Sequence, residues 1–388
     1  MKKMKKMKKL YLYPRDRKLL IRHRNMLTGK IGKLWAGIFC IGLFCSCQRS
    51  VPFAFEDIEY VTTFDKETRI PQRLRSEVDF GVDGIRSFKI VDHYILVSSE
   101  SKDGMVTVLE AEPPFHKLGS FFKKGNGPGE LIYPFPTTGF NYAHDVDGEL
   151  YAEFDNHAGK LIRFYVDRSI REGKTVSEVI GTTEKTSFDV INLGETGVFY
   201  KELTSEKDAQ MRYIMKDGQK IVTKSMAILN AARIRNKGDD GSRFNVLSGS
   251  VKFDPASKVF AETPGSINAI HLYSLDDSFA KTFCFGTKMY DYNEIADLPS
   301  AERPLTSICT RQYEDFLAVL YLDVTKREFS LDDSWRPSII LLQWDGSYRL
   351  KIHLSERVDS FDIDFNTLRL FAFDSETETM YMYDMSEM

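Results

Sequence analysis

Cysteine is scarce in this chain of 388 residues, which has only five, at positions 40, 45, 47, 284 and 309. So few cysteines, with no Cys-x-x-Cys pair among them, argue against a disulfide framework and a zinc site of common spacing. The sequence also lacks Gly-x-Ser-x-Gly, His-Glu-x-x-His and an EF-hand calcium loop. Common hydrolase, metalloprotease and calcium-sensor motifs are therefore missing, and stability must come from an apolar core.

Acidic residues are nearly missing from the first 46 positions, which hold 13 of the 53 Lys and Arg residues but only one acid, Asp16. The remainder, from Cys47 onward, has 40 basic and 55 acidic residues, a formal charge of −15. Such an acidic body argues against nucleic acid as a partner, because a phosphate backbone requires a basic surface. The lysine-rich start is accounted for by an extended leader, or by an over-long start if translation begins at Met26 rather than Met1.

The leader has an apolar core of 11 residues, Leu34–Phe44, which follows Lys30 and Lys33 and ends in Cys45-Ser46-Cys47-Gln48. Eleven residues cannot span a bilayer core that needs roughly 20, so the pattern indicates a signal peptide. Its end resembles a bacterial lipoprotein box, and this resemblance implies cleavage before Cys47 and lipid on its sulfur. We expect a leader over residues 1–46, a lipidated linker over 47–55 and a folded domain over 56–388. The resemblance implies attachment to the outer membrane, with the periplasmic and surface-facing sides both open.

The folded part is predicted to be all-β, since helical periodicity is nearly absent after Cys47. Short apolar segments separated by turn residues indicate a four-stranded antiparallel meander, at residues 85–91, 94–98, 105–109 and 118–122. One exception is Ser225–Ile234, where two or three helical turns are expected as an insertion.

The meander recurs along the chain. Near copies of one element, Ser-Phe-Lys-Ile-Val or Ser-Phe-Asp, begin at Ser87, Ser187 and Ser360. Their separations of 100 and 173 residues fit two and three periods of roughly 50–58 residues, the size of a four-stranded propeller blade. The sequence therefore predicts a six-bladed β-propeller. The other three blades are expected to start at residues 146–152, 250–253 and 307–310.

The last predicted blade ends at Met380–Asp384, one strand short, while Ile58–Phe64 is a spare strand before the first blade. Pairing the two chain ends would close the ring and remove an exposed sheet edge. We therefore expect closure by an N-terminal strand.

A glycine-rich segment, Lys124-Gly125-Asn126-Gly127-Pro128-Gly129-Glu130, follows the first blade. Glycine tolerates positive φ angles and Pro128 stiffens the turn. A phosphate-binding loop is disfavoured, because Pro134 and Pro136 prevent the helix that it would need. The segment resembles the junction of NHL-type propeller repeats, and with Gly125, Gly127, Pro128, Gly129 and Glu130 it is similar to TolB-like six-bladed propeller lipoproteins of Gram-negative bacteria. That resemblance implies a fold but no ligand, and the junction occurs only once.

The repeated element also supplies the candidate site. Alternate residues of a strand share a face, so Phe88, Phe188 and Phe361 are expected between blades while Lys89, Asp189 and Asp362 face the channel. Asp145 and Asp147 could join them from the second blade. Converging carboxylates could hold a divalent cation, a sugar or a cationic peptide group. The alternative is that each Asp accepts hydrogen bonds from local backbone amides.

No catalytic residue is assigned, and the six histidines after Cys47 are scattered singly. The leading hypothesis is a non-catalytic binding or scaffold module for a peptide, glycan or partner protein of the envelope. The alternative is a metal-dependent lyase or hydrolase at the propeller axis, which would need at least three convergent ligands. Cys284 and Cys309 are expected to remain free, because strands of neighbouring blades separate them by more than the 7 Å or so that a disulfide spans.

Overall fold

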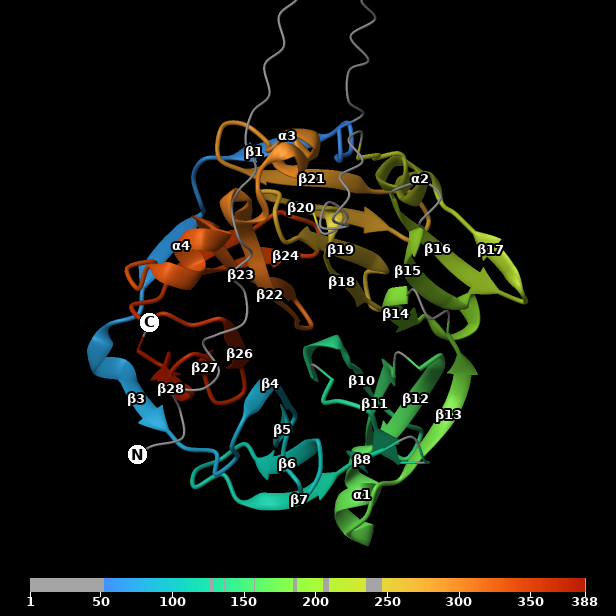
Figure 1. Cartoon of the computed structure of the whole chain (residues 1–388), viewed down its shortest axis with the longest axis vertical. Helices are drawn as coiled ribbons and strands as arrows, with labels where there is room; N and C mark the ends of the chain where they lie inside the picture. The colour runs from blue at the N-terminus through green and yellow to red at the C-terminus, as the bar shows by residue number, and fades with distance from the viewer. Residues whose placement is uncertain are drawn as a thin grey trace, which may run out of the picture. The chain divides into compact units, whose positions relative to one another are not determined.

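The computed structural model describes residues 52–387 except 126, 128, 136, 157, 184–186, 205–208 and 235–245. The leader and Cys47 lie outside the described residues. Six antiparallel sheets of four core strands follow one another around a ring (Figure 1), each formed from one continuous stretch of chain apart from added N-terminal strands. The fold is a six-bladed β-propeller, as the sequence predicts.

The first three blades each have four strands, numbered from the channel outward. Their bounds are β4 (Ile85–Val91), β5 (Tyr94–Ser99), β6 (Val106–Glu110) and β7 (Lys117–Phe121) in blade 1; β10 (Asn141–His144), β11 (Leu150–Asp155), β12 (Lys160–Tyr165) and β13 (Ser177–Thr182) in blade 2; and β14 (Ser187–Asn192), β15 (Val198–Thr204), β16 (Ala209–Lys216) and β17 (Gln219–Ile221) in blade 3.

The last three blades recruit strands from the N-terminal segment. The bounds are β18 (Gly249–Asp254), β19 (Val259–Pro264), β20 (Ala269–Ser274) and β21 (Ala280–Phe285) with β1 (Ile58–Val61) in blade 4; β22 (Pro304–Gln312), β23 (Phe316–Thr325), β24 (Ser338–Gln343) and β25 (Arg349–His353) with β2 (Lys66–Arg69) in blade 5; and β26 (Ser360–Asp364), β27 (Arg369–Asp374) and β28 (Thr379–Asp384) with β3 (Arg75–Val78) in blade 6.

Helices occur only in connections between described strands. They are α1 (Val166–Glu172), α2 (Lys224–Asn230), α3 (Tyr292–Asp297) and α4 (Lys326–Leu331), with the 3-10 turns η1 (Gln72–Leu74), η2 (Thr137–Gly139), η3 (Gly194–Thr196) and η5 (Ser300–Glu302). The predicted helix at 225–234 is confirmed as α2, and the Thr223 side chain caps it by accepting a bond from the Met226 amide. None of the helices in the described part of the chain is long and apolar enough to cross a membrane.

The predicted start of the second blade is wrong. Residues 146–152 hold a hairpin turn and the beginning of β11, while the innermost strand is β10, Asn141–His144. The sequence Asn-Tyr-Ala-His has little apolar character, and half of this strand is exposed. The predicted starts of blades 3 to 6 fall in β14, β18, β22 and β26.

An N-terminal strand closes the ring, but not the strand expected. The predicted closing strand, Ile58–Phe64, contains β1, which pairs in parallel with β21 of blade 4. The chain then adds β2 in parallel to β25 of blade 5, and only β3 pairs antiparallel with β28 as the fourth strand of blade 6. The segment from β1 to β3, called the belt below, therefore runs past three successive blades (Figure 1).

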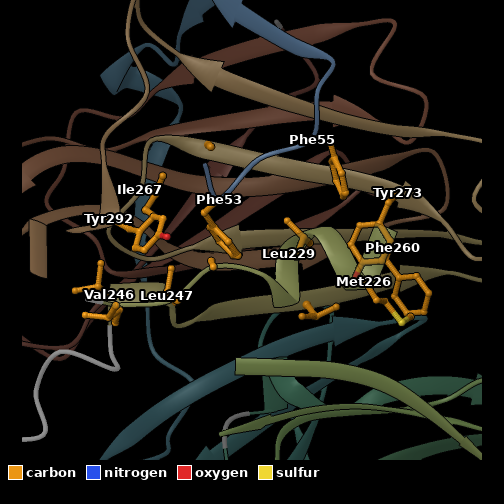
Figure 2. Packing of buried hydrophobic residues seen from close by; sticks show 14 of the residues in the cluster. Phe53, Phe55, Met226, Leu229, Val246, Leu247, Phe260, Ile267, Tyr273 and Tyr292 are labelled. Carbon is orange, nitrogen blue, oxygen red and sulfur yellow. The ribbon is translucent and has the colours of Figure 1, made fainter. Parts of the chain in front are cut away.

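Large apolar side chains fill the spaces between blades. Phe88 and Phe361 are fully buried, which confirms their predicted position, while the Phe188 side chain lies outside what the structure describes. Ahead of the belt, Phe53 and Phe55 insert between blades 3 and 4. Figure 2 shows them among Met226 and Leu229 of α2 and the rings of blade 4, and the Phe55 amide donates to Thr282 Oγ1 at 2.9 Å.

The glycine-rich segment is the junction between blades 1 and 2, as predicted from Gly125, Gly127, Gly129 and Glu130. Two short strands, β8 (Lys123–Lys124) and β9 (Glu130–Leu131), pair across it. The Glu130 carboxylate accepts a hydrogen bond from the Gly127 amide at 2.7 Å, and Gly129 has a φ of +73°. A side chain at Gly125 would collide with Glu130. Pro128 lies outside the described residues.

Candidate binding site in the axial channel

The innermost strand of every blade contributes one polar residue to a set that we call the axial ring. Its members are Lys89, Asn141, Asp189, Lys252, Arg311 and Asp362, from β4, β10, β14, β18, β22 and β26 respectively. Three cations and two carboxylates give the ring a formal charge of +1. They occupy equivalent positions of the innermost strands, and Asp362 contacts both Lys89 and Arg311, at 3.3 and 3.7 Å.

Asp362 is completely buried and joins three blades at the point where the ring closes. The Ile90 amide of blade 1 donates to its Oδ2 at 2.6 Å, and the Tyr313 hydroxyl of blade 5 donates to its Oδ1 at 2.5 Å. Lys89 Nζ lies 3.3 Å from the same carboxylate. The Asp362 carboxylate therefore accepts hydrogen bonds from the backbone, which is the alternative to a ligand site predicted from the sequence. The Ile90 amide, however, belongs to a neighbouring blade and is not local in sequence.

Arg311 and Asn141 connect innermost strands in the same way. Arg311 donates from Nε to the Phe361 carbonyl at 2.6 Å and from Nη2 to the Phe88 carbonyl at 3.1 Å. Asn141 Nδ2 donates to the Val190 carbonyl at 3.2 Å. The Arg311 bonds are buried and charge-assisted, and therefore stronger than the neutral bond of Asn141, but both side chains connect adjacent blades at the axis.

Burial shifts the pKa of three members of the ring, Asp189, Lys252 and Lys89. Burial raises the pKa of Asp189, and the charges of Lys201 and Lys252 oppose this effect. Burial lowers the pKa of Lys252 to about 8, and repulsion from Arg311 and Lys89 adds to the decrease while Asp189 opposes it. Burial likewise lowers the pKa of Lys89, against the attraction of Asp362. The cost of desolvating these ions is thus only partly offset by their partners.

A hollow opens on either side of the ring. One hollow, of about 490 Å³, lies at the end of the channel where the innermost strands begin. Its lining includes Asp189, Lys252, Cys309 and Lys326. A second hollow, of about 950 Å³, lies at the opposite end, beside the hairpins that follow the innermost strands. We call it the hairpin-side hollow. Both volumes lie within the range of small-molecule sites, roughly 300–1,000 Å³.

The hairpin-side hollow combines aromatic rings with side-chain amides. The aromatic rings come from four blades and include those of Tyr142, Tyr151, Phe253, Tyr313 and Phe365. The side-chain amides come from blades 2, 3, 5 and 6 and are those of Asn141, Asn192, Gln312 and Asn366. Phe365 keeps 41% of its surface exposed and packs edge-on against Tyr313, at 4.9 Å between ring centroids. Such a surface offers apolar faces and neutral polar groups to the same ligand.

The structure brings some of the predicted site residues together and leaves others apart. Lys89 and Asp189 line opposite hollows, and Asp362 lies between blades. Asp145 and Asp147 are instead in the hairpin turn between β10 and β11 and line neither hollow. Asp145 accepts from the Asp147 and Glu149 amides at 2.9 and 3.0 Å and pairs with Arg168 at 2.6 Å, so its contacts are local.

Sequence reasoning missed three members of the ring. Lys252 follows Ser-Val and Arg311 follows Cys-Thr, where the recognised copies have Ser-Phe, and Asn141 follows Phe140 in the blade whose start was misplaced. An alignment of all six innermost strands on the polar third position could have found them. The net positive charge also differs from the convergence of carboxylates expected from the sequence.

A second buried charge cluster lies between blades 3 and 4. Glu262 accepts bonds from Arg212, including one from Nε at 2.7 Å, and from Lys201 Nζ at 2.9 Å, with all three side chains at most 1% exposed. His271 lies beside them, and burial lowers its pKa to about 4. Phe53 covers this cluster, with its ring 4.9 Å from that of His271. No local sequence pattern predicts this cluster.

Cys284 and Cys309 are free, as predicted, with Cys284 buried and Cys309 half-buried. Among the described residues, no group of three or more His, Cys, Asp or Glu side chains is placed to hold a metal ion.

Comparison with known proteins identifies no family: no family model matches the chain, and no curated protein matches it. Among solved structures, a protein of Bacteroides fragilis described as exported is similar at 11% identity, over 82% of this chain and 98% of that one, with a TM-score of 0.41. Regucalcin of Agrobacterium tumefaciens, described as calcium-binding, matches at 9% identity over 82% and 95%, with a TM-score of 0.43. A hypothetical selenium-binding protein of Sulfolobus tokodaii matches at 12% identity over 69% and 66%, with a TM-score of 0.36.

Proposed function

We propose that this chain is a non-catalytic binding module of the cell envelope, anchored to the outer membrane by lipid on Cys47. It would take a peptide, glycan or other small ligand into the hairpin-side hollow. The TolB-like and NHL-like resemblance of the glycine-rich junction and the lipoprotein-like leader support this placement among envelope propellers.

The observation that carries the binding role is the composition of the hairpin-side hollow. Aromatic rings and amides from several blades surround about 950 Å³ above buried charges. An exposed aromatic side chain in such a concave site offers a ligand a large apolar face beside polar groups. Phe365, exposed by 41%, occupies this position.

Binding can be tested by screening saccharides and short peptides for an increase in the melting temperature of the purified protein. A ligand of the hollow should lose at least about tenfold in affinity in Phe365→Ala. Tyr60→Ala removes a similarly exposed ring, 49% accessible, from the belt and should leave affinity unchanged. Equal loss in both variants, or no ligand in the screen, would contradict a site in the channel.

Lipid attachment requires a separate experiment. Cells grown with an alkyne-bearing fatty acid should label the wild-type protein, and Cys47→Ala should abolish the label. Retention of label in this variant would rule out Cys47 as the anchor.

A further inference from the structure

The floor of the hairpin-side hollow is cationic. Lys89, Lys252 and Arg311 line it, together with Asn141. Among the described residues around this hollow, the axial ring supplies these cations and one amide but neither of its carboxylates. Asp362 lies behind the floor, fully buried, and Asp189 faces the opposite hollow.

Arg311 adds a donor that the protein itself does not use. Its side chain is 1% exposed, and Nε and Nη2 bond to blades 6 and 1, as described above. Nη1 is buried without a hydrogen-bond partner among the described residues. A buried guanidinium donor left without an acceptor is costly, and the charge of Arg311 adds to that of the floor, which this residue lines.

Among the described residues, five acids line the walls of this hollow: Asp92, Glu153, Asp254, Glu314 and Asp364. Four of them pair with a neighbouring side chain: Asp92 with His144 at 2.7 Å, Glu153 with Arg163 at 2.6 Å, Asp254 with the Ser257 hydroxyl at 2.5 Å, and Asp364 with the Thr367 hydroxyl at 2.6 Å. These carboxylates keep their charges, but none of them belongs to the axial ring, so the ring members that form the floor are cations and one amide.

The walls favour a saccharide as the body of the ligand. Side-chain amides both donate and accept hydrogen bonds, as sugar hydroxyls do, and four amides line this hollow. Aromatic rings beside them can pack against the apolar faces of a sugar ring. The remaining lining residues include Thr196 and Thr310, which add hydroxyl groups.

We propose that the hairpin-side hollow binds an acidic saccharide, with its carboxylate or sulfate on Lys89, Lys252 and Arg311 and its ring against Tyr151, Tyr313 and Phe365. This assignment rests on the binding function proposed above and specifies its ligand class. Since the body of the protein carries a formal charge of −15, capture of an anion depends on this local site.

The protonation of Lys252 gives the site a pH dependence. Lys89, Arg311, Asp189 and Cys309 act on its charge, and its pKa of about 8 means that it is largely charged at pH 6.5 and largely neutral at pH 9.5. An anion on the floor should therefore bind more weakly as the pH rises through 8.

The test is calorimetric titration of the purified protein with a disaccharide containing glucuronic acid. Its neutral counterpart, in which the carboxylate is reduced to a hydroxymethyl group, is the matched probe; inorganic sulfate and triglutamate are further probes. We expect the acidic disaccharide to bind at least about tenfold more tightly than the neutral one and than either further probe.

The matched variants are Lys252→Gln and Lys66→Gln. Lys66 is an exposed lysine of β2 in the belt and lines neither hollow, so its variant removes an equal charge away from the channel. Lys252→Gln should lose at least about tenfold in affinity, and Lys66→Gln should change it less than twofold. Lys252→Arg, which keeps the charge, should retain binding and serves where Lys252→Gln does not fold.

Equal affinity for the acidic and neutral disaccharides would overturn the proposal, as would equal effects of the two lysine variants, loss of binding in Lys252→Arg, or preference for triglutamate or for free sulfate. If saccharides bind without preference for charge and Phe365→Ala weakens them, the channel function stands and the anionic ligand class fails. If no probe of any class binds, both fail.

Discussion

The buried cluster between blades 3 and 4 allows a quantitative test of how the propeller is held together. Replacing Glu262 by Gln keeps the size of the side chain but removes the only carboxylate that contacts both Arg212 and Lys201 among the described residues. Arg212 would then remain buried at 1% exposure without its counter-ion, and Lys201 would keep only the more distant Asp189, at 4.0 Å. Blades 3 and 4 should consequently separate more easily.

The expected cost follows from the burial. Removing one partner of a buried ion pair destabilises a protein by about 3–5 kcal/mol, because the remaining charge is desolvated without compensation. For a folded chain of about 340 residues, the entropy of unfolding is roughly 0.7 kcal/mol/K. Glu262→Gln should therefore lower the melting temperature by about 4–7 °C.

The assay is thermal and urea unfolding of the wild type and two variants. Glu178→Gln is the control, because Glu178 pairs with Arg163 on the surface, at 3.5 Å and with 49% of its side chain exposed. The control should cost no more than about 1 kcal/mol. If Glu262→Gln were no less stable than Glu178→Gln, the buried carboxylate would not be what compensates Arg212 and Lys201.

Three other perturbations have definite expected outcomes. Burial lowers the pKa of His271 from 6.5 to about 4, so the neutral side chain contributes its full stability above pH 6.5 and loses that contribution as the pH falls toward 4. The stability lost over this range is about 3 kcal/mol. In urea titrations at pH 7 and 4.5, His271→Gln should therefore lose less stability on acidification than the wild type. Phe53→Ala removes a fully buried ring and should lower the free energy of unfolding by about 3 kcal/mol or more. If residues 52–57 detach instead, their hydrogen exchange should become faster. Unchanged stability together with unchanged exchange would contradict the packing role of Phe53. Asp362→Asn should destabilise the propeller by about 3–5 kcal/mol in urea unfolding, because Lys89 loses its charged partner. An unchanged midpoint of urea unfolding would argue against a role of Asp362 in holding blades 6 and 1 together.

The fold was predictable because a local strand pattern recurs at regular spacing, although it is clear in only three of the six blades, those with Ser87, Ser187 and Ser360. Phe88 and Phe361 are buried because alternation along a strand determines which face meets the next blade. The strand β3 escaped prediction because Arg-Ser-Glu-Val is short, polar and partly exposed, so only its pairing with β28 makes it a strand.

The site was only partly predictable, for a different reason. Lys89, Asp189 and Asp362 were found because they follow a recognisable Ser-Phe pair, whereas Lys252 and Arg311 follow other residues. Glu262 and Arg212 lie 50 residues apart, on different blades, and no local pattern relates them. The pairing of Glu262 with Arg212 depends on how blades 3 and 4 pack. The separation of cations from carboxylates at the hairpin-side hollow likewise depends on how the blades pack around the axis.

The belt has a consequence for the order in which the molecule can be completed. Synthesis delivers residues 58–78 early, yet their partners are β21, β25 and β28, and the last of these ends at Asp384. Contacts so distant in sequence form slowly. The strand β1 must therefore wait unpaired until residue 285 has been made, and β3 must wait until nearly the whole chain has followed. Truncation near the C-terminus that removes β28 would leave β3 without its partner strand.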